Sequence, residues 1–225
     1  MRLLAPLEAR VLGVLVEKAA TVPDSYPLSL NALVTGCNQK TARDPVMAAS
    51  DDEVLAAIDG LKGLSLLFET SGSRVVRFEH NMPRALQIPG AAAALLAMLM
   101  LRGPQTAAEL RLNTERLHRF ADISSVEAFL DELAAKTPPR TRKLPRAPGE
   151  REARWVHLLC GEPEIAPRAY AAAERGHDVT PAADVSVGEV AALRAEQTRL
   201  AAEVDRLRAH VDRLARELGV TLDGV

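Results

Sequence analysis

The sequence is poor in aromatic residues and in cysteine. Aromatics make up 3% of its 225 residues, and its two cysteines, Cys37 and Cys160, stand in no Cys-x-x-Cys or Cys/His cluster. Zinc and dithiol motifs are therefore absent, and each cysteine is expected to be a buried free thiol. The longest uncharged apolar run, 91–101, is about half of the roughly 20 residues that a membrane-spanning helix needs. Glu8 and Arg10 interrupt the N-terminal apolar stretch, so we expect no secretory signal, a cytoplasmic location and no membrane contact.

Motifs of common enzymes are also missing. The sequence contains no Gly-x-Gly-x-x-Gly, Gly-x-x-x-x-Gly-Lys-Ser/Thr, Gly-x-Ser-x-Gly or His-Glu-x-x-His. Its five histidines are scattered, and His80 and His157 hold equivalent positions in two similar segments, which favours a structural role over a metal site. We therefore expect no enzymatic activity, no metal site and no cofactor.

Charge and composition limit the remaining classes of protein. The formal net charge of −2 excludes a uniformly basic protein that coats nucleic acid, so any DNA contact must be local. Hydrophobic residues make up 48% of the chain, which is enough for a core, and alanine-rich, aromatic-poor sequences favour helices. These values predict a mainly helical globular protein.

Composition divides the chain into four segments. Residues 1–86 and 91–160 are expected to be globular and are separated by a short stretch that contains proline and glycine. Residues 161–186 are rich in alanine, proline and polar residues, which is typical of a flexible linker. The pattern of residues 187–219 predicts a long helix.

The two globular segments resemble each other. Phe78 and His80 have counterparts in Trp155 and His157, and apolar positions of a preceding helix repeat as well. Each segment is predicted to contain three helices followed by a β-hairpin. The expected helices are 7–15, 28–37 and 54–61, then 91–101, 106–112 and 125–135, and the expected hairpins are 66–68 with 75–78, and 142–160.

Three helices followed by a hairpin are typical of the winged-helix variety of the helix-turn-helix. The predicted fold class is therefore mainly α with small β-hairpins, with two tandem winged-helix domains before a C-terminal coiled coil. Capping boxes of Ser50 with Glu53 and of Thr106 with Glu109 are expected to start two of the helices. In this fold one helix can enter the DNA major groove while the hairpin contacts phosphates, but the same fold also binds proteins.

The C-terminal segment carries an unbroken heptad repeat. Apolar residues, with one glutamine among them, follow a spacing of three and four that is typical of a coiled coil. The seam residues are Val190, Leu193, Gln197, Leu200, Val204, Leu207, Val211, Leu214 and Leu218. Valine at most a positions with leucine at every d position favours a parallel dimer, so self-association is expected. The alternative is an amphipathic helix that folds back on its own domains.

Basic residues concentrate on the second predicted hairpin and beside the second helix of that module. Arginine and lysine there can contact DNA phosphates, and Asn and Gln can read adenine. The candidate DNA-binding residues are Gln39, Lys40, Arg111, Arg116, Arg119, Arg140, Arg142, Lys143, Arg146 and Arg151. Alternatively, the hairpin arginines pair with glutamates of their own hairpin. The third helix of the first module counts against DNA, because it carries Asp51, Asp52, Glu53 and Asp59.

Several segments carry a family resemblance. They include LEARVLG at 7–13, YPLSLN at 26–31, CNQK at 37–40, RDPV at 43–46, LRGPQT at 101–106, LPR at 144–146 and HL at 157–158. Together they resemble the YceH-like family of bacterial proteins over about residues 4–160. The resemblance implies a bacterial origin and a tandem winged-helix fold, and it implies no activity. Within these segments Glu8, Arg10 and Asp44 are expected to form internal ion pairs.

Two functions follow from this pattern as hypotheses. The first is a dimeric protein that binds double-stranded DNA, such as a transcriptional regulator, because tandem winged helices, a basic hairpin and a coiled coil suit a palindromic site. The second is an adaptor or scaffold whose winged helices bind a protein partner. The acidic third helix of the first module favours this second hypothesis.

Overall fold

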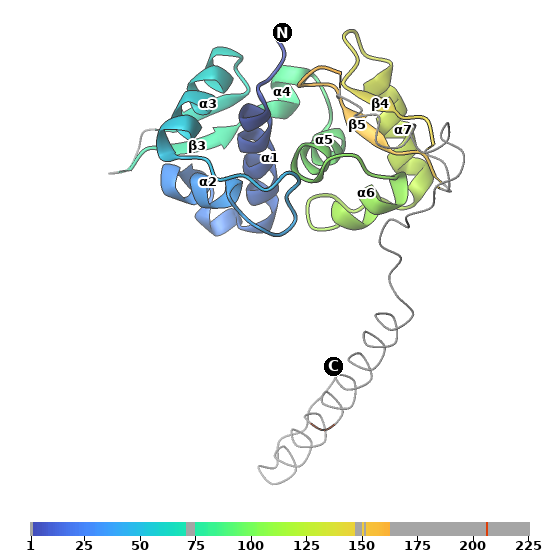
Figure 1. The fold of residues 1–225 in the computed structure, drawn as a ribbon, viewed down its shortest axis with the longest axis horizontal. Coiled ribbons are helices and arrows are strands. Elements are labelled where there is room, and N and C mark those ends of the chain that lie inside the picture. Colours follow the sequence, from blue (N-terminus) through green and yellow to red (C-terminus); the bar gives the residue numbers. More distant parts are fainter. Residues whose placement is uncertain (1, 71–74, 147–149, 151, 163–205, 207–225) are drawn as a thin grey trace, which may run out of the picture. The chain divides into compact units, whose positions relative to one another are not determined.

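A computed structural model describes residues 2–70, 75–146, 150, 152–162 and 206 (Figure 1). All nine residues of the predicted coiled-coil seam lie outside this range, as do Arg151 and nearly all of the predicted linker 161–186. The described residues confirm a mainly helical fold with small antiparallel sheets. Within them, every helix is too short or too polar to cross a bilayer.

The first half of the fold, residues 2–86, contains five helical segments and a small sheet. In chain order they are α1 (Pro6–Thr21), the 3-10 turn η1 (Pro23–Ser25), β1 (Leu28–Ser29), α2 (Leu30–Cys37), α3 (Asp51–Gly63), β2 (Leu67–Thr70), β3 (Arg77–His80) and α4 (Met82–Leu86). The strands pair antiparallel in the order β1-β3-β2, with Leu28 opposite Phe78 and Phe68 opposite Glu79. The sheet therefore joins the start of α2 to the hairpin that follows α3.

The second half, residues 90–162, repeats the order of three main helices followed by an antiparallel pair of strands. It contains α5 (Gly90–Arg102), α6 (Ala107–Asn113), α7 (Ile123–Ala134), β4 (Thr141–Lys143) and β5 (Trp155–His157). Strands β4 and β5 form an antiparallel pair, and Gln105 makes an isolated bridge to Trp155. That bridge is the counterpart of the Leu28–Phe78 pairing, because both of its residues lie 77 positions further along the chain.

The N-caps of the helices repeat in the same way. The Ser29 hydroxyl accepts from the backbone of Ala32 at the start of α2, and the Thr106 hydroxyl accepts from Glu109 at the start of α6. Both expected capping boxes, Ser50 with Glu53 and Thr106 with Glu109, are confirmed. These bonds satisfy backbone donors that the first helical turn leaves without a partner, which explains why the helices begin where they do.

Several element boundaries differ from the prediction. Helix α2 begins at Leu30 because Leu28 and Ser29 pair with β3 instead. Both strands of the first hairpin lie one or two residues later than expected, because the pairing with β1 places Arg77 and Phe78 at the start of β3. Helix α4 was not predicted; it begins with a proline in its first turn and ends before Gln87, which has a left-handed conformation.

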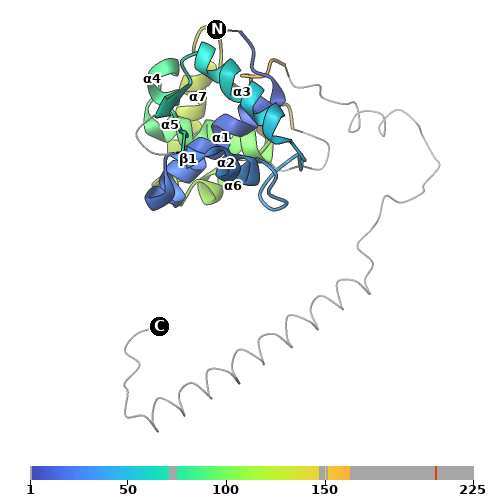
Figure 2. The same cartoon turned by 90° about the vertical axis from the view of Figure 1, so that its left-hand side faces the viewer.

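The two halves share one hydrophobic core. Helices α1 and α5 lie side by side at its centre, as both ribbon views show (Figures 1 and 2). Every residue of α5 from Ala91 to Leu101 is buried, and all of them except Ala94 join residues of α1, α3 and α7 in one cluster. The short stretch between residues 86 and 90 therefore connects two halves that are packed together.

Candidate functional site

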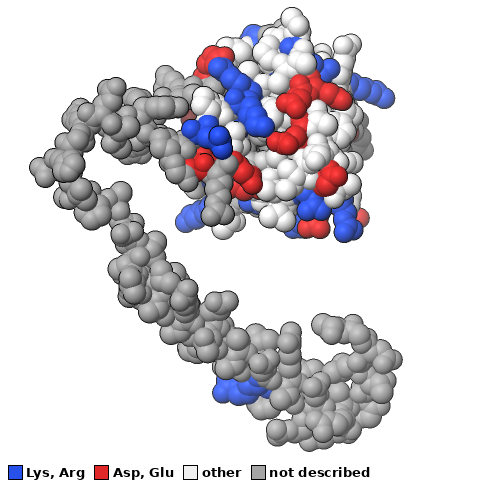
Figure 3. Space-filling view, turned by 90° about the vertical axis from the view of Figure 1, so that its right-hand side faces the viewer, with Lys and Arg blue, Asp and Glu red and all other residues white. Residues whose placement is uncertain are grey.

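The surface of the second half mixes charges of both signs. On the face shown in Figure 3, lysine and arginine side chains lie next to aspartate and glutamate side chains. Such interspersed charges cancel one another over short distances, and a DNA phosphate backbone is held by a surface where cations predominate. Whether a given lysine or arginine could contact DNA phosphates therefore depends on whether it is already paired with a carboxylate of the protein.

The predicted basic hairpin residues are largely engaged within the protein. Arg142 forms an ion pair with Glu162. Lys143 Nζ lies 3.1 Å from Glu127 Oε1 on α7 and 5.3 Å from the centre of the Trp155 ring. Arg140 is half-buried, and burial lowers the pKa of its guanidinium. Arg142 and Lys143 therefore pair with carboxylates outside the predicted hairpin 142–160 rather than with glutamates of the hairpin itself.

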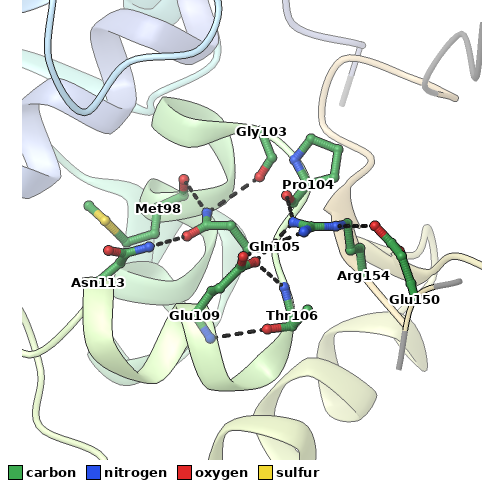
Figure 4. Close-up of polar contacts among 9 residues, drawn as sticks. All are labelled: Met98, Gly103, Pro104, Gln105, Thr106, Glu109, Asn113, Glu150 and Arg154. Carbon is green, nitrogen blue, oxygen red and sulfur yellow. Dashed lines mark hydrogen bonds and ion pairs between the residues drawn. The ribbon is translucent and has the colours of Figure 1, made fainter. Parts of the chain in front are cut away.

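Arg154 ties the hairpin to the start of α6 (Figure 4). Its Nη1 lies 2.9 Å from Glu109 Oε2 and donates to the carbonyl oxygen of Pro104 at 3.1 Å, while its Nε lies 3.3 Å from Glu150 Oε1. Glu109 at the same time accepts from the backbone of Thr106 in the capping box. Arg154 therefore has a structural role, because it links the start of α6 to the residue just before β5.

Gln105 adds a second polar tie in the same region. Its side-chain nitrogen donates to the carbonyl oxygen of Met98 at 3.0 Å, and its side-chain oxygen accepts from Asn113 at 2.7 Å (Figure 4). Gln105 is buried, so these bonds also satisfy a polar side chain that water does not reach. They hold α5, α6 and the bridge to Trp155 together.

Three exposed candidate arginines lie on α6 and on the turn that follows it. Arg111, Arg116 and Arg119 are exposed, and none of the three forms an ion pair with a carboxylate of the described residues. Arg111 Nη2 donates to the carbonyl oxygen of Ala121 at 3.1 Å. This bond holds Arg111 close to the start of α7.

The other candidates are dispersed. The Gln39 side-chain oxygen accepts from Arg43 Nη2 at 2.6 Å, so this amide already has a partner inside the first half. Lys40 and Arg146 are exposed, the first after α2 and the second after β4. Arg111 and Arg119 line one small pocket of the second half, whereas Gln39 and Lys40 lie on the other half of the fold.

Several charges inside the first half have structural roles. Arg43 Nη2 lies 2.6 Å from Glu17 Oε2, and its side chain is 1% exposed. Burial alone would raise the pKa of Glu17, but the hydrogen bond and the charge of Arg43 outweigh it and lower that pKa. Arg2 bonds to Glu8, which confirms an ion pair for Glu8 and lowers its pKa.

The expected ion pair of Arg10 is wrong. Its side chain is buried, and it donates to the carbonyl oxygens of Cys37 at 3.1 Å and Pro45 at 2.6 Å. Backbone oxygens can replace a carboxylate here because Cys37 at the end of α2 and Pro45 in the following loop both present their carbonyl oxygens to the guanidinium. Asp44 is exposed, and its backbone nitrogen donates to the carbonyl oxygen of Leu101 at 2.8 Å, which links that loop to α5.

A cavity of about 250 Å³ lies where the two halves meet. Arg10, Met47, Met100, His157 and Cys160 are among the residues that line it. Burial lowers the pKa of His157 to about 4 and raises the pKa of Cys160 to about 11. At neutral pH the imidazole is therefore uncharged and the thiol is protonated. Among the described residues no cluster of three metal-ligating side chains occurs.

A larger groove of about 530 Å³ lies on the first half, between α3 and the β2–β3 hairpin. Apolar side chains line it, including Leu55, Val75 and Val76, which are 39%, 54% and 44% exposed. Acidic residues of α3 and β2 also line it: Asp51, Asp59 and Glu69. We name this feature the α3–hairpin groove. Its lining residues are Ser29, Leu30, Asn31, Asp51, Leu55, Ile58, Asp59, Lys62, Glu69, Val75, Val76 and Phe78.

This groove is not among the sites predicted from the sequence. Two signals could have pointed to it. Leu55 follows three acidic residues on the polar face of α3, and Val75 and Val76 are adjacent apolar residues before a strand, where side chains alternate between faces. Only the approach of the hairpin to α3 brings these residues into one surface.

Comparison with known proteins places the chain in a family. Residues 4–150 match the family described as "Protein of unknown function, DUF480". A UPF0502 protein of Leptothrix cholodnii is 65% identical over 220 residues, which cover 98% of this chain and 97% of that protein. A UPF0502 protein of Burkholderia cenocepacia is 65% identical over 223 residues, with 99% and 92% covered, and one of Burkholderia pseudomallei is 66% identical over 220 residues, with 98% and 91% covered. The chain therefore belongs to the DUF480/UPF0502 family of bacterial proteins.

Proposed function

We propose that this protein is a non-catalytic adaptor built from two tandem winged helices, and that it binds a partner protein through its first half. The α3–hairpin groove carries this proposal. In a winged helix that reads DNA, the third helix lies in the major groove and the hairpin lies over the backbone. Here the corresponding surface is apolar and acidic, which suits a protein partner and would repel phosphates.

The order of the elements supports the winged-helix assignment. In the first half a short strand precedes α2 and pairs with the hairpin that follows α3, and the Gln105–Trp155 bridge repeats that pairing in the second half. The resemblance of the sequence to YceH-like proteins agrees with this assignment.

The second half gives further support for a protein partner. Helix α7, the counterpart of α3, exposes Asp131 and Glu132, and its Glu127 already pairs with Lys143 of the hairpin. Phosphates approaching this helix would meet like charge. A dimer formed through residues 187–219 would present two copies of each surface to a partner.

DNA binding is the second candidate function, and one observation favours it. Arg111, Arg116 and Arg119 are exposed around the turn before α7, where phosphate contacts are expected in this fold. These three side chains could neutralise phosphates without help from the hairpin.

Affinity purification of the cross-linked full-length chain, with and without nuclease, tests the adaptor. We expect a stoichiometric protein partner that persists after nuclease treatment. In parallel, gel shifts with random and bacterial DNA at about 0.15 M ionic strength are expected to show no retarded band. Loss of every partner on nuclease treatment, together with a band abolished by the triple variant R111Q/R116Q/R119Q, would favour DNA binding instead.

A further inference from the structure

We propose that the α3–hairpin groove accepts an amphipathic segment of a partner protein that carries lysine or arginine beside its apolar side chains. This inference rests on the proposed adaptor function and names the chemistry of the partner. Such a partner segment would need an apolar floor that can hold its side chains and an excess of acidic groups at the rim. The groove must also be unsuited to other occupants.

The apolar part of the groove has a rigid floor and exposed walls. Ile58 and Phe78 are 1% and 4% exposed and belong to the hydrophobic core, so they form a fixed base. Leu55 on α3 and Val75 and Val76 on the hairpin keep between 39% and 54% of their surface exposed. A concave apolar surface of this kind releases water when a complementary apolar side chain fills it.

The acidic part of the groove selects the charge of its occupant. Asp51, Asp59 and Glu69 line it, and Lys62 is its one basic lining residue among those described. Lys62 Nζ lies 2.7 Å from Glu69 Oε2 and 3.8 Å from Asp59 Oδ1, so it offsets part of this charge and leaves an acidic excess. Complementary cations on the partner would set orientation and speed association.

Charge also argues against two other occupants. A nucleic acid would bring phosphates against these carboxylates. The same groove of a second copy would place acidic residues against acidic residues, because a two-fold interface brings identical surfaces together. A segment of a different surface or protein with basic and apolar residues satisfies both parts of the groove.

Two designed helical peptides with a fluorescent label test the proposal on the full-length chain. One presents a leucine stripe flanked by lysines, and the other has glutamate at every lysine position. We expect saturable binding of the lysine peptide in fluorescence anisotropy, weakened by salt, and at least about tenfold weaker binding of the glutamate peptide.

Variants of the groove then locate the binding site. Leu55→Gln and Val76→Thr are expected to weaken binding of the lysine peptide about tenfold, and Asp59→Lys to weaken the lysine peptide and strengthen the glutamate peptide. The matched controls are on the second half: Leu112→Gln replaces a leucine that is 70% exposed, and Asp131→Lys reverses an exposed charge on α7. All these positions are exposed, and thermal unfolding followed by circular dichroism verifies that each variant is folded.

The outcomes separate the groove from the adaptor function. Equal binding of both peptides, or equal effects of the groove and control variants, would overturn the groove assignment. If the native partner persists after nuclease treatment and is still captured by Leu55→Gln, the adaptor function stands and the groove is wrong. If the lysine peptide binds wild type but no partner survives nuclease treatment, the groove stands and the adaptor function fails. Competition by a peptide of residues 187–219 would assign the groove to the chain's own C-terminal segment and would also overturn the proposal.

Discussion

A Cβ atom on Gly13 of α1 would lie 3.0 Å from Cγ of Leu101 on α5. Side-chain atoms rarely pack this closely, so glycine at position 13 permits the first helices of the two halves to meet. The contact lies inside the single buried cluster that both halves share.

Gly13→Val is therefore expected to lower the free energy of unfolding by about 1–3 kcal/mol through overpacking. Chemical denaturation followed by circular dichroism measures the change. Gly63→Val is the matched control, because a Cβ at Gly63 of α3 would meet no atom within 4 Å. We expect wild type to unfold residues 2–162 in one transition because the core is shared. Two separate transitions would contradict this view, as would equal effects of the two variants.

The buried pair of Glu17 and Arg43 gives a prediction for acid stability. Glu17→Gln leaves a guanidinium that is 1% exposed without its anion and is expected to cost about 3 kcal/mol. The pKa of Glu17 is lower in the folded protein, so the pair stabilises the fold above the ordinary pKa of glutamate, and this stabilisation is lost as the pH falls through the lowered value. Denaturation between neutral and acidic pH should show a flatter profile for Glu17→Gln. The control Glu115→Gln changes an exposed carboxylate and should leave the profile as in wild type.

His157 should make the free energy of unfolding depend on pH in a higher range than Glu17 does. Burial lowers its pKa from 6.5 to about 4, so the unfolded chain takes up this proton at higher pH than the folded protein. The free energy of unfolding should therefore fall as the pH drops from 6.5 towards 4, by up to about 3 kcal/mol. An NMR titration of the imidazole gives the pKa directly. His157→Gln should remove this part of the pH dependence and the exposed control His118→Gln should not; a His157 that titrates at 6.5 would refute the prediction.

The coiled coil stays a prediction from the heptad repeat. Replacing both Leu200 and Leu207 with glutamate should convert a dimer into a monomer, because burial of each leucine contributes roughly 1.5–3 kcal/mol per chain. Residues 2–162 should remain folded in this variant. The control places glutamate at Ala202 and Ala209, two heptad positions that face away from the seam. Light scattering measures the mass, and an unchanged mass in the leucine variant would mean that the helix packs on its own chain.

The sequence by itself determined the features that depend on neighbouring residues. Five of the six predicted helices appear within three residues of their predicted bounds, because apolar spacing and the capping boxes at Ser50 and Thr106 act within a turn or two of the chain, whereas α1 continues to Thr21, six residues beyond its predicted end. The similarity of Phe78 to Trp155 in sequence likewise has its counterpart in two equivalent strand pairings.

Only the tertiary structure decided which distant residues meet. Leu28 pairs with Phe78, and Gln105 forms a bridge to Trp155. In both cases the partner lies 50 positions further along the chain, and only the fold brings the two backbones together. Three cations of the second hairpin are paired with carboxylates that only the fold brings near them. The pairs are Lys143 with Glu127, Arg154 with Glu109 and Arg142 with Glu162. The α3–hairpin groove likewise exists because the fold brings Leu55 of α3 and Val76 of the hairpin to the lining of one pocket. Such contacts depend on loop closure and packing over the whole core, and no local pattern in the sequence specifies them.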